Sequence, residues 1–320
     1  MTAAHGARAV DRLGFGAASI GNLYRAVSDD QARSVLDAAW EGGIRHFDTA
    51  PHYGLGLSER RLGAFLRTKP RHEFTISTKV GRLLVPNPAY AGGTDEADGF
   101  VVPDDLAREF DPSESGVRRS LAESLERLGL DRVDTLLLHD PDVYDLDEGL
   151  SLGVPALTKL RKEGVVDRIG IGVNSADAAT RAVREGDLDV VMIAGRYTLL
   201  EQPALDELLP LCDDRGVGVL AAAVFNSGLL AAADPSTAHY DYDDVPAALV
   251  ERTRRLRSVC ERFSVALPAA AIQYPLRHPR VERVVVGTAR VSSLRANIEH
   301  IAADVPEDLW AALQAEGLIR

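Results

Sequence analysis

The stretch Val133-Asp134-Thr135-Leu136-Leu137-Leu138-His139 is a short, almost continuous apolar run that ends in a histidine. A strand that is apolar along most of its length, rather than at every second residue, is typical of a parallel sheet covered by helices. Seven further runs of this kind recur along the chain, separated by longer amphipathic stretches. The predicted strands are Leu13–Ala18, Ile44–Thr49, Phe74–Val80, Val133–His139, Arg168–Val173, Leu188–Ala194, Val217–Ala222 and Val281–Val286.

The stretches between these runs carry helix start and stop signals. Ser28 with Gln31 has the form of a capping box, and Gly42 follows the amphipathic residues after it. A second helix is predicted between Ser113 and Gly129. Strand–helix alternation repeated eight times predicts an α/β fold, a single (β/α)₈ TIM barrel with long loops after its strands, formed by residues 1–320.

An open, doubly wound sheet is the competing architecture. Such a sheet with a dinucleotide site carries a G-x-G-x-x-G turn between the first strand and the first helix. Here Gly14-Phe15-Gly16 is followed by Ala17-Ala18-Ser19, so the third glycine is missing. The missing fingerprint favours the barrel.

Composition limits the classes of partner. The formal net charge is −12, which argues against nucleic-acid binding. The longest apolar runs, such as Val217–Phe225, are too short to cross a bilayer, and residues 1–12 lack the apolar segment of a secretory signal. Cys212 and Cys260 have no metal-binding spacing. We therefore expect a cytoplasmic protein, a monomer or small homo-oligomer, with a small-molecule substrate, no membrane contact and no metal site.

Two segments are longer than ordinary connections, Gly81–Pro112 and Asn226–Val245. Both follow predicted strands, and in a barrel the loops after the strands form the face that carries the chemistry. Loops of this length in a compact domain are usually functional or mobile.

Three neighbouring predicted strands end in ionisable residues, Asp48, Lys79 and His139. Tyr53 follows Asp48 by five residues, in a turn that folds back over the same end of the barrel. Taken singly, each residue has an ordinary explanation, such as a helix cap, a solvent-reaching lysine, a core histidine or a packing aromatic. Together they indicate a site, because a buried charge is costly unless it is paired.

These four side chains suit proton transfer to or from an oxygen. An ordinary phenol has a pKa near ~10, and a neighbouring ammonium is predicted to lower the pKa of Tyr53. A histidine can hydrogen-bond the reacting oxygen and orient it. None of these groups accepts hydride, so a redox reaction requires a cofactor. No G-x-S-x-G, H-E-x-x-H or P-loop motif offers a competing chemistry.

At these residues the sequence resembles the aldo-keto reductase family. The motif Asp48-Thr49-Ala50-x-x-Tyr53-Gly54 carries most of the resemblance. The other matching stretches, in family order, are Gly14–Gly16, Gly42–Phe47, Ser58-Glu59, Thr78-Lys79, Arg119–Leu121, Leu128-Gly129, Asp134 to His139, Gly170–Asn174 and Gly287 to Asn297. Segments such as Ile20–Tyr24, Gly81–Leu84 and His139–Asp142 also resemble the subgroup of L-fucose and D-threo-aldose 1-dehydrogenases and pyridoxal 4-dehydrogenase.

The resemblance implies a nicotinamide cofactor and a role for each member of the group. Tyr53 would donate or accept the proton, Lys79 and Asp48 would tune it, and His139 would position the carbonyl or alcohol. Asn174 matches the family position that holds the nicotinamide carboxamide. The other residues expected to line the cofactor site are Gly16, Asp48, Phe225, Gly228, Leu230, Gly287, Thr288, Arg290, Ser293 and Asn297.

Departures from the family pattern bear on the choice of cofactor. The usual glutamine and stacking tyrosine of the sixth and seventh strands appear as Ala194 and Ala222, with Phe225 as a substitute aromatic. The basic residues that usually hold a 2′-phosphate align with Gly287 and Ser293, although Arg290 and Arg295 lie nearby. A 2′-phosphate requires fixed cationic partners, so we expect NAD rather than NADP.

Polar residues near the expected mouth favour a hydroxylated substrate. The resemblance to the subgroup implies that this substrate is an aldose, oxidised at C1 to a lactone. The candidate substrate contacts are Tyr24, His52, Arg82, Asp140 and Asn226. Two alternatives stay open. One keeps the mechanism with pyridoxal or another aldehyde or ketone, and the other is a cofactor-binding regulatory subunit on the same fold.

Overall fold

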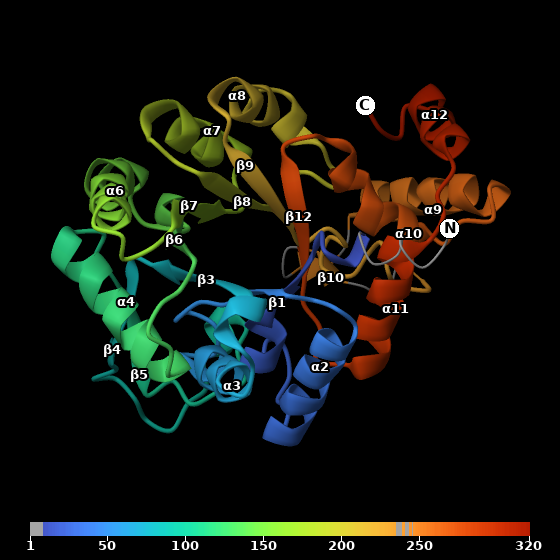
Figure 1. The fold of residues 1–320 in the computed structure, drawn as a ribbon. Coiled ribbons are helices and arrows are strands. Elements are labelled where there is room, and N and C mark those ends of the chain that lie inside the picture. Colours follow the sequence, from blue (N-terminus) through green and yellow to red (C-terminus); the bar gives the residue numbers. More distant parts are fainter. Residues whose placement is uncertain (1–8, 235–238, 241–242, 245) are drawn as a thin grey trace.

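In the computed structural model, which describes residues 9–234, 239–240, 243–244 and 246–320, eight parallel strands close into a barrel. The strands are β1 (Leu13–Gly16), β2 (His46–Asp48), β3 (Thr75–Val80), β6 (Thr135–His139), β7 (Arg168–Val173), β8 (Val190–Ala194), β9 (Gly218–Ala222) and β12 (Val281–Val286). They follow one another around the barrel in chain order, and β12 pairs with β1 to close it. All eight predicted strands are therefore confirmed, two of them with the predicted bounds and six of them shorter, and the doubly wound sheet is excluded (Figure 1).

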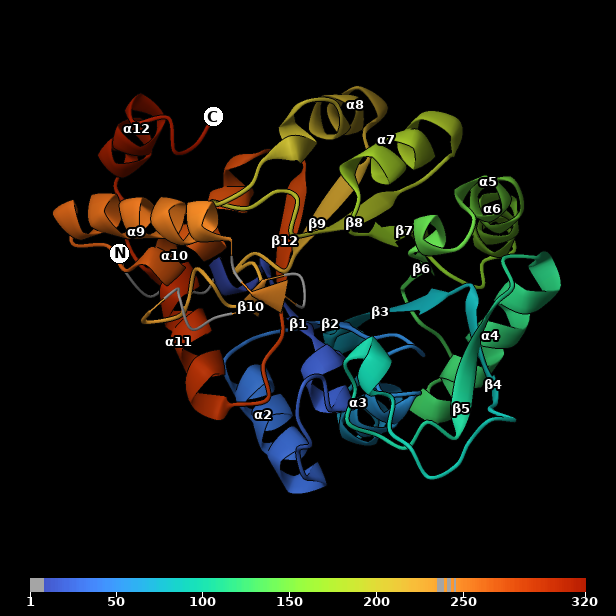
Figure 2. The same cartoon turned by 180° about the vertical axis from the view of Figure 1, so that it is seen from behind.

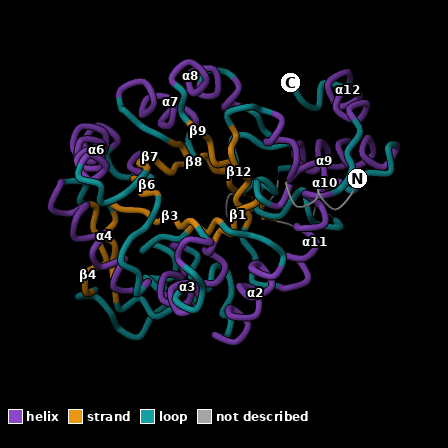
Figure 3. Tube along the Cα trace, in the orientation of Figure 1, coloured by secondary structure: helices purple, strands orange, loops and turns teal. Residues whose placement is uncertain are grey.

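Helices connect successive strands and form an outer ring around the barrel, as Figure 3 shows. The ring consists of α2 (Asp29–Glu41), α3 (Leu57–Leu66), α4 (Glu114–Leu128), α6 (Val154–Lys162), α7 (Ala176–Glu185), α8 (Leu208–Arg215), α9 (Ala247–Arg262), α10 (Leu267–Gln273) and α11 (Val291–Ala302), with α12 (Glu307–Ala315) packed on α9.

The local signals act as predicted. The Ser28 hydroxyl accepts a hydrogen bond from the backbone N–H of Gln31, and Ser113 caps α4 in the same way. Gly129 ends α4 in the left-handed conformation that glycine adopts at low cost. Because such caps satisfy the orphan groups at helix ends, the boundaries of α2 and α4 follow from short sequence motifs.

Two layers of apolar side chains make the core. Leu137, Val190, Met192, Leu220 and Val285 pack together as one buried cluster of strand residues. A larger cluster lies between strands and helices, where Phe47 and Phe65 meet with their ring centroids 6.1 Å apart. Cys212 and Cys260 are buried in α8 and α9 as free thiols.

The first long segment is not an irregular loop. Within residues 81–112, β4 (Arg82–Pro86) and β5 (Leu106–Phe110) form an antiparallel hairpin that lies beside α4 (Figure 2). Between them, Phe100 and Val102 pack with Leu55 and Leu84 in a small apolar cluster at the mouth of the barrel. The second long segment, Asn226–Val245, contains the short pair β10 (His239–Tyr240) and β11 (Asp243–Asp244), and its residues 235–238, 241–242 and 245 lie outside the described residues.

No helix in the described ranges is long and apolar enough to cross a membrane.

Candidate active site

Three neighbouring strands bring ionisable side chains to one end of the barrel. Asp48 ends β2, Lys79 is the fifth residue of β3, and His139 ends β6. The register pairs β3 with both β2 and β6, so that these side chains emerge at the same, carboxyl end. The structure thus brings the three residues together as the strand pattern predicts.

Lys79 is the centre of the group. Its Nζ donates hydrogen bonds to Asp48 Oδ2 at 2.6 Å, to the Thr49 carbonyl at 3.0 Å and to Tyr53 Oη at 3.0 Å. Asp48 receives a further bond from Ser77 Oγ at 2.7 Å. Asp48 and Lys79 are each only 2% exposed, so this is a buried ion pair whose charges are fully partnered.

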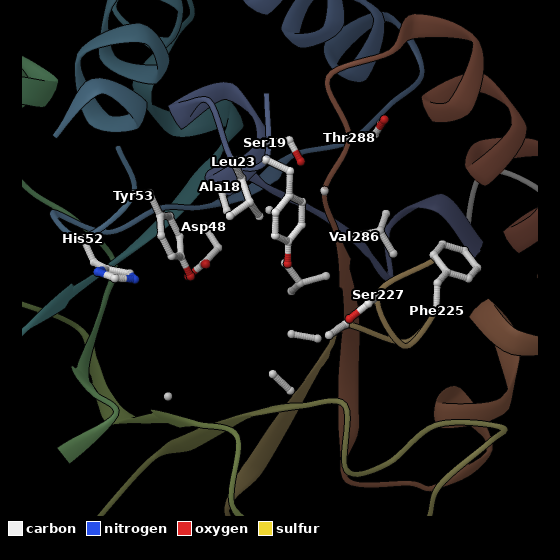
Figure 4. Close-up of a pocket in the computed structure, with 18 of the residues that line it drawn as sticks. Ala18, Ser19, Leu23, Asp48, His52, Tyr53, Phe225, Ser227, Val286 and Thr288 are labelled. Carbon is white, nitrogen blue, oxygen red and sulfur yellow. The ribbon is translucent and has the colours of Figure 1, made fainter. Parts of the chain in front are cut away.

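The turn after β2 positions Tyr53 above this pair. Gly54 has a φ of +61°, and a Cβ there would meet the Gly21 carbonyl oxygen at 2.1 Å. Close backbone approach of Gly21 and Gly54 therefore presses the tyrosine turn onto the segment after β1. Ser58 secures the same turn by donating to the Ala17 carbonyl at 2.9 Å. The phenol has to face the barrel mouth as a result (Figure 4).

The net pKa of Tyr53 differs from what its neighbour Lys79 alone would produce. Burial raises the pKa of Tyr53 above its ordinary value, and the ammonium of Lys79 offsets only part of this effect. Lys79 acts on the pKa of Tyr53 in the predicted direction, but the net pKa lies above the ordinary value because the loss of solvent around the phenol outweighs the attraction. Burial acts to lower the pKa of Lys79, but Asp48 and Tyr53 hold that pKa above its usual value, so the lysine is a cation.

His139 also lies against the phenol, edge-on, with its ring centroid 5.8 Å from that of Tyr53. Burial, followed by the positive charges of Arg82 and Lys79, lowers the pKa of His139 well below its ordinary value. The imidazole is therefore neutral. Its Nδ1 is buried and has no hydrogen-bond partner among the described residues, and its Nε2 lies 3.4 Å from Asp140 Oδ2.

A cavity of about 680 Å³ opens beside these four residues. It extends from Tyr53 and His139 past Ala194 and Ala222 to the amino end of α11. Cavities of this size hold cofactors and substrates. Residues predicted for the cofactor that line it are Gly16, Asp48, Asn174, Phe225, Gly228, Gly287, Thr288, Arg290 and Ser293. Figure 4 shows Phe225 and Ser227 on the wall opposite Tyr53.

Several predicted contacts lie elsewhere. Leu230 and Asn297 are buried and do not border the cavity. Asn226 is buried too, and its Nδ2 donates to Glu201 Oε2 at 3.0 Å instead of facing a ligand. Arg82 lies behind the wall, where it binds Asp140 at 2.7 Å. Of the predicted substrate contacts, Tyr24, His52 and Asp140 line the cavity.

The end of the cavity at α11 fits an anionic group. No side chain caps the amino terminus of α11, its first turn contains no acidic residue, and Arg290 is the N-cap residue. Helix N–H groups that lack a side-chain partner favour phosphate. Gly228 leaves open space where a Cβ would stand, so the facing wall does not obstruct a long ligand. This part of the cavity therefore fits the diphosphate of a dinucleotide.

The cavity wall also contains strained backbone. Tyr24, Asp140, Ala223 and Ser227 all have a φ between +40° and +60°, a left-handed conformation that is rare outside glycine. Such residues cluster at ligand sites because the surrounding structure has to hold them there.

Sequence reasoning missed Arg108. It lies in β5, is 7% exposed as a side chain, and contacts His52, Asp95 and Asp98. Nothing in the sequence around it shows that the β4–β5 hairpin would return this guanidinium to the barrel mouth. Within the described residues no group of three His, Cys, Asp or Glu side chains is placed to hold a metal ion.

A parallel barrel with an Asp–Lys–Tyr–His group beside a dinucleotide-sized cavity is the architecture of a nicotinamide-dependent carbonyl and alcohol oxidoreductase. The comparisons agree, since the family described as "Aldo/keto reductase family" matches residues 12–316. The chain belongs to the aldo/keto reductase family, whose members are oxidoreductases that work with a nicotinamide cofactor.

Two relatives match nearly the whole chain. A D-threo-aldose 1-dehydrogenase of Pseudomonas sp is 57% identical over 313 residues, which cover 97% of this chain and 95% of the relative. A pyridoxal 4-dehydrogenase of Microbacterium luteolum is 38% identical, with coverage of 97% and 95%.

Solved structures agree on the fold. An aldo-keto reductase from Bacillus halodurans in its holo form has a TM-score of 0.76 at 23% identity, covering 97% of this chain and 92% of its own. A glycerol dehydrogenase from Gluconobacter oxydans has a TM-score of 0.72 at 21% identity, with coverage of 95% and 90%.

Proposed function

We propose that this protein oxidises the C1 hydroxyl of an aldose to a lactone, with NAD as the preferred hydride acceptor. The observation that carries the substrate class is the 57% identity to a D-threo-aldose 1-dehydrogenase over 97% of the chain. The polar wall supports it, because His52 and Asp140 face the cavity next to Tyr53 and His139 and can bond sugar hydroxyls.

The proton chemistry follows from the contacts of Tyr53. The C1 oxygen of the sugar would lie between the phenol oxygen of Tyr53 and the imidazole of His139. The nicotinamide ring supplies a hydride acceptor for the hydrogen on C1. As the C1–O double bond forms, the hydroxyl proton passes to Tyr53, and the Lys79 ammonium stabilises the phenolate that accepts it.

His139 would orient the C1 oxygen that Tyr53 deprotonates. A neutral imidazole can donate one hydrogen bond to the C1 oxygen without taking its proton, and its lowered pKa keeps it neutral. The residues proposed to hold the cofactor are those that line the cavity from Asn174 to the α11 amino terminus. Leu230 and Asn297 would act only from behind that wall.

NAD is favoured by the side chains around α11. Gly287 and Ser293, which stand at the positions expected to hold a 2′-phosphate, carry no charge. Arg290 lines the cavity, whereas Arg295 does not. The positions expected to hold a 2′-phosphate therefore offer no fixed cationic partner of their own.

The testing experiment is a panel of free aldoses, pyridoxal and simple aldehydes with NAD and NADP, read by nicotinamide absorbance. We expect reduction of NAD with L-fucose-like or D-threo-aldoses. Pyridoxal is the second candidate substrate because of the 38% identical relative, and its preference over every aldose would overturn the aldose proposal. Absence of turnover with all compounds would favour a cofactor-binding regulatory role.

A further inference from the structure

His52 is held between two guanidinium groups. Its Nδ1 lies 2.5 Å from Arg108 Nε and 3.3 Å from Arg82 Nη1. A guanidinium has donors only, so Nδ1 accepts, with its one lone pair directed at the nearer Arg108, and cannot carry a hydrogen. The hydrogen of the neutral ring is therefore on Nε2.

The surrounding charges prevent His52 from taking a second proton. Burial, followed by the positive charges of Arg82, Arg108 and Lys79, lowers the pKa of His52 to about 2. The two arginines are themselves fixed, because Arg82 binds Asp140 at 2.7 Å and Arg108 binds carboxylates in the segment between β4 and β5.

Arg108 also fixes the backbone of the tyrosine turn. Its Nη2 donates to the His52 carbonyl at 3.1 Å, and its Nη1 binds Asp95 and Asp98 at 2.7 Å each. This arginine therefore links the β4–β5 segment to both the ring and the backbone of His52. If either aspartate were lost, Arg108 would still be bound by the other aspartate and by the His52 carbonyl, so its position does not depend on one contact.

The donor at Nε2 is available to a ligand. His52 lines the cavity, and no hydrogen bond within the described part of the chain involves its Nε2. Its ring centroid lies 6.0 Å from that of Tyr53 and 5.4 Å from that of His139. Figure 4 shows the ring beside Tyr53 at the edge of the open space. A donor in this place lies next to the oxygen that Tyr53 and His139 would hold.

We propose that His52 is a specificity-determining residue whose Nε2–H binds the oxygen on the carbon adjacent to the reacting carbon, with Arg108 as the residue that positions it. This inference rests on the proposed function and narrows it to substrates with a hydroxyl next to the anomeric carbon. Oxygens on neighbouring carbons lie within hydrogen-bond distance of each other, so a donor beside both catalytic rings reaches the second oxygen. A bound substrate without that hydroxyl covers this donor and leaves it without a partner, which is penalised.

Two substitutions separate the functions of the ring. His52→Asn keeps an oxygen that can accept from Arg82 and Arg108 but removes the donor that faces the cavity. His52→Gln extends a donor into the cavity but removes the acceptor. They are compared on the best aldose of the panel and its 2-deoxy counterpart, starting with L-fucose and 2-deoxy-L-fucose.

We expect the wild type to prefer the 2-hydroxy sugar in kcat/KM by roughly 10-fold, the effect of about one hydrogen bond. His52→Asn should abolish this preference by lowering kcat/KM for the 2-hydroxy sugar alone, and His52→Gln should retain part of it. An equal loss on both sugars would overturn the role of His52 and leave the proposed function intact. A wild type that oxidises neither sugar would overturn both.

The tautomer is tested without substrate. In protein with ¹⁵N-labelled histidine, NMR should show His52 as the Nε2–H form from pH 5 to pH 9. Arg108→Met should raise the pKa of His52, because it removes a neighbouring positive charge. If Arg108 only stabilised the fold, the pKa of His52 would not have to change. A hydrogen on Nδ1, or protonation of His52 above pH 5 in the wild type, would overturn the inference whatever the activity.

Discussion

Each end of the barrel contains an ion pair and a neutral histidine, but only the pair at the carboxyl end borders a cavity. At the amino end, Arg168 and Glu282 form a bidentate ion pair at 2.7 and 2.8 Å, and His46 is buried beside them. At the carboxyl end, Lys79 and Asp48 pair beside His139. The charges at the amino end face one another, whereas those at the carboxyl end border a cavity of about 680 Å³.

The difference shows that an ion pair beside a buried, neutral histidine does not by itself identify a site. Gly218 makes room for the Glu282 carboxylate, since a Cβ there would meet Glu282 Oε1 at 1.9 Å, so the amino end closes on its own side chains. At the other end Lys79 has a second side-chain partner, Tyr53, which also lines the cavity. The two ends therefore differ in whether a group proposed to transfer a proton borders a cavity that can hold a ligand.

The largest expected effect follows from breaking the pair at the carboxyl end. Lys79→Met removes the cation that stabilises the phenolate, so turnover should fall by about 10²–10⁴. It also leaves Asp48 buried and unpaired, which should lower the free energy of unfolding by about 3–5 kcal/mol. Denaturant unfolding and steady-state kinetics measure the two effects.

The double variant Lys79→Met with Asp48→Asn is the matched control. It removes both charges, so it should recover most of the stability and none of the activity. Recovery of turnover in the double variant would contradict the role given to Lys79.

The next effect is the pH dependence of turnover. Because burial raises the pKa of Tyr53, the phenol is protonated at neutral pH in the free protein. Oxidation needs the deprotonated phenol, so its rate should rise toward alkaline pH by up to about 10-fold per unit, while carbonyl reduction should fall at high pH. Rates measured in both directions from pH 6 to pH 11 test this, and parallel profiles would count against Tyr53 as the proton-transferring group.

A smaller effect concerns acid stability at the amino end. Burial and then Arg283 lower the pKa of His46 to about 3, against an ordinary 6.5. Between about pH 6.5 and pH 3 the imidazole is protonated in the unfolded chain but not in the folded chain. The contribution of His46 to the free energy of unfolding is therefore fully present above about pH 6.5 and is lost as the pH falls toward 3. The slope from this group is up to about 1.4 kcal/mol per pH unit, and His46→Gln should reduce it. Equal slopes in both proteins would show that His46 is protonated when folded.

The smallest effect is expected from Glu282→Gln. Both partners of this ion pair are 37% exposed as side chains, so the loss should stay below about 1 kcal/mol. Turnover should not change. A large loss of activity would mean that the two ends of the barrel are coupled, and would break the comparison.

The barrel and its central group were predictable because they depend on local and periodic features. Eight apolar runs set the strands, and parallel register places residues at strand ends on one face, which predicts that Asp48, Lys79 and His139 meet. The place of Tyr53 was predictable from its short separation from Asp48.

Features that depend on tertiary packing were not predictable. The β4–β5 hairpin places Arg108 against His52 across more than fifty residues of sequence, and no local pattern encodes that return. The contact of Asn226 with Glu201, which keeps its side chain from the cavity, also depends on packing between segments distant from each other in the sequence. The net rise in the pKa of Tyr53 was not predicted, because burial outweighs the neighbouring charge and the extent of burial cannot be read from residue types.

The measurement that tests the central claim most directly is hydride transfer in a single turnover by Tyr53→Phe, together with a titration of nicotinamide cofactor by fluorescence. The substitution removes one oxygen and leaves the Lys79–Asp48 pair in place. The account predicts cofactor binding close to that of the wild type and a transfer rate lower by about 10²–10⁴. Transfer at the wild-type rate, with the cofactor bound equally well, would contradict it.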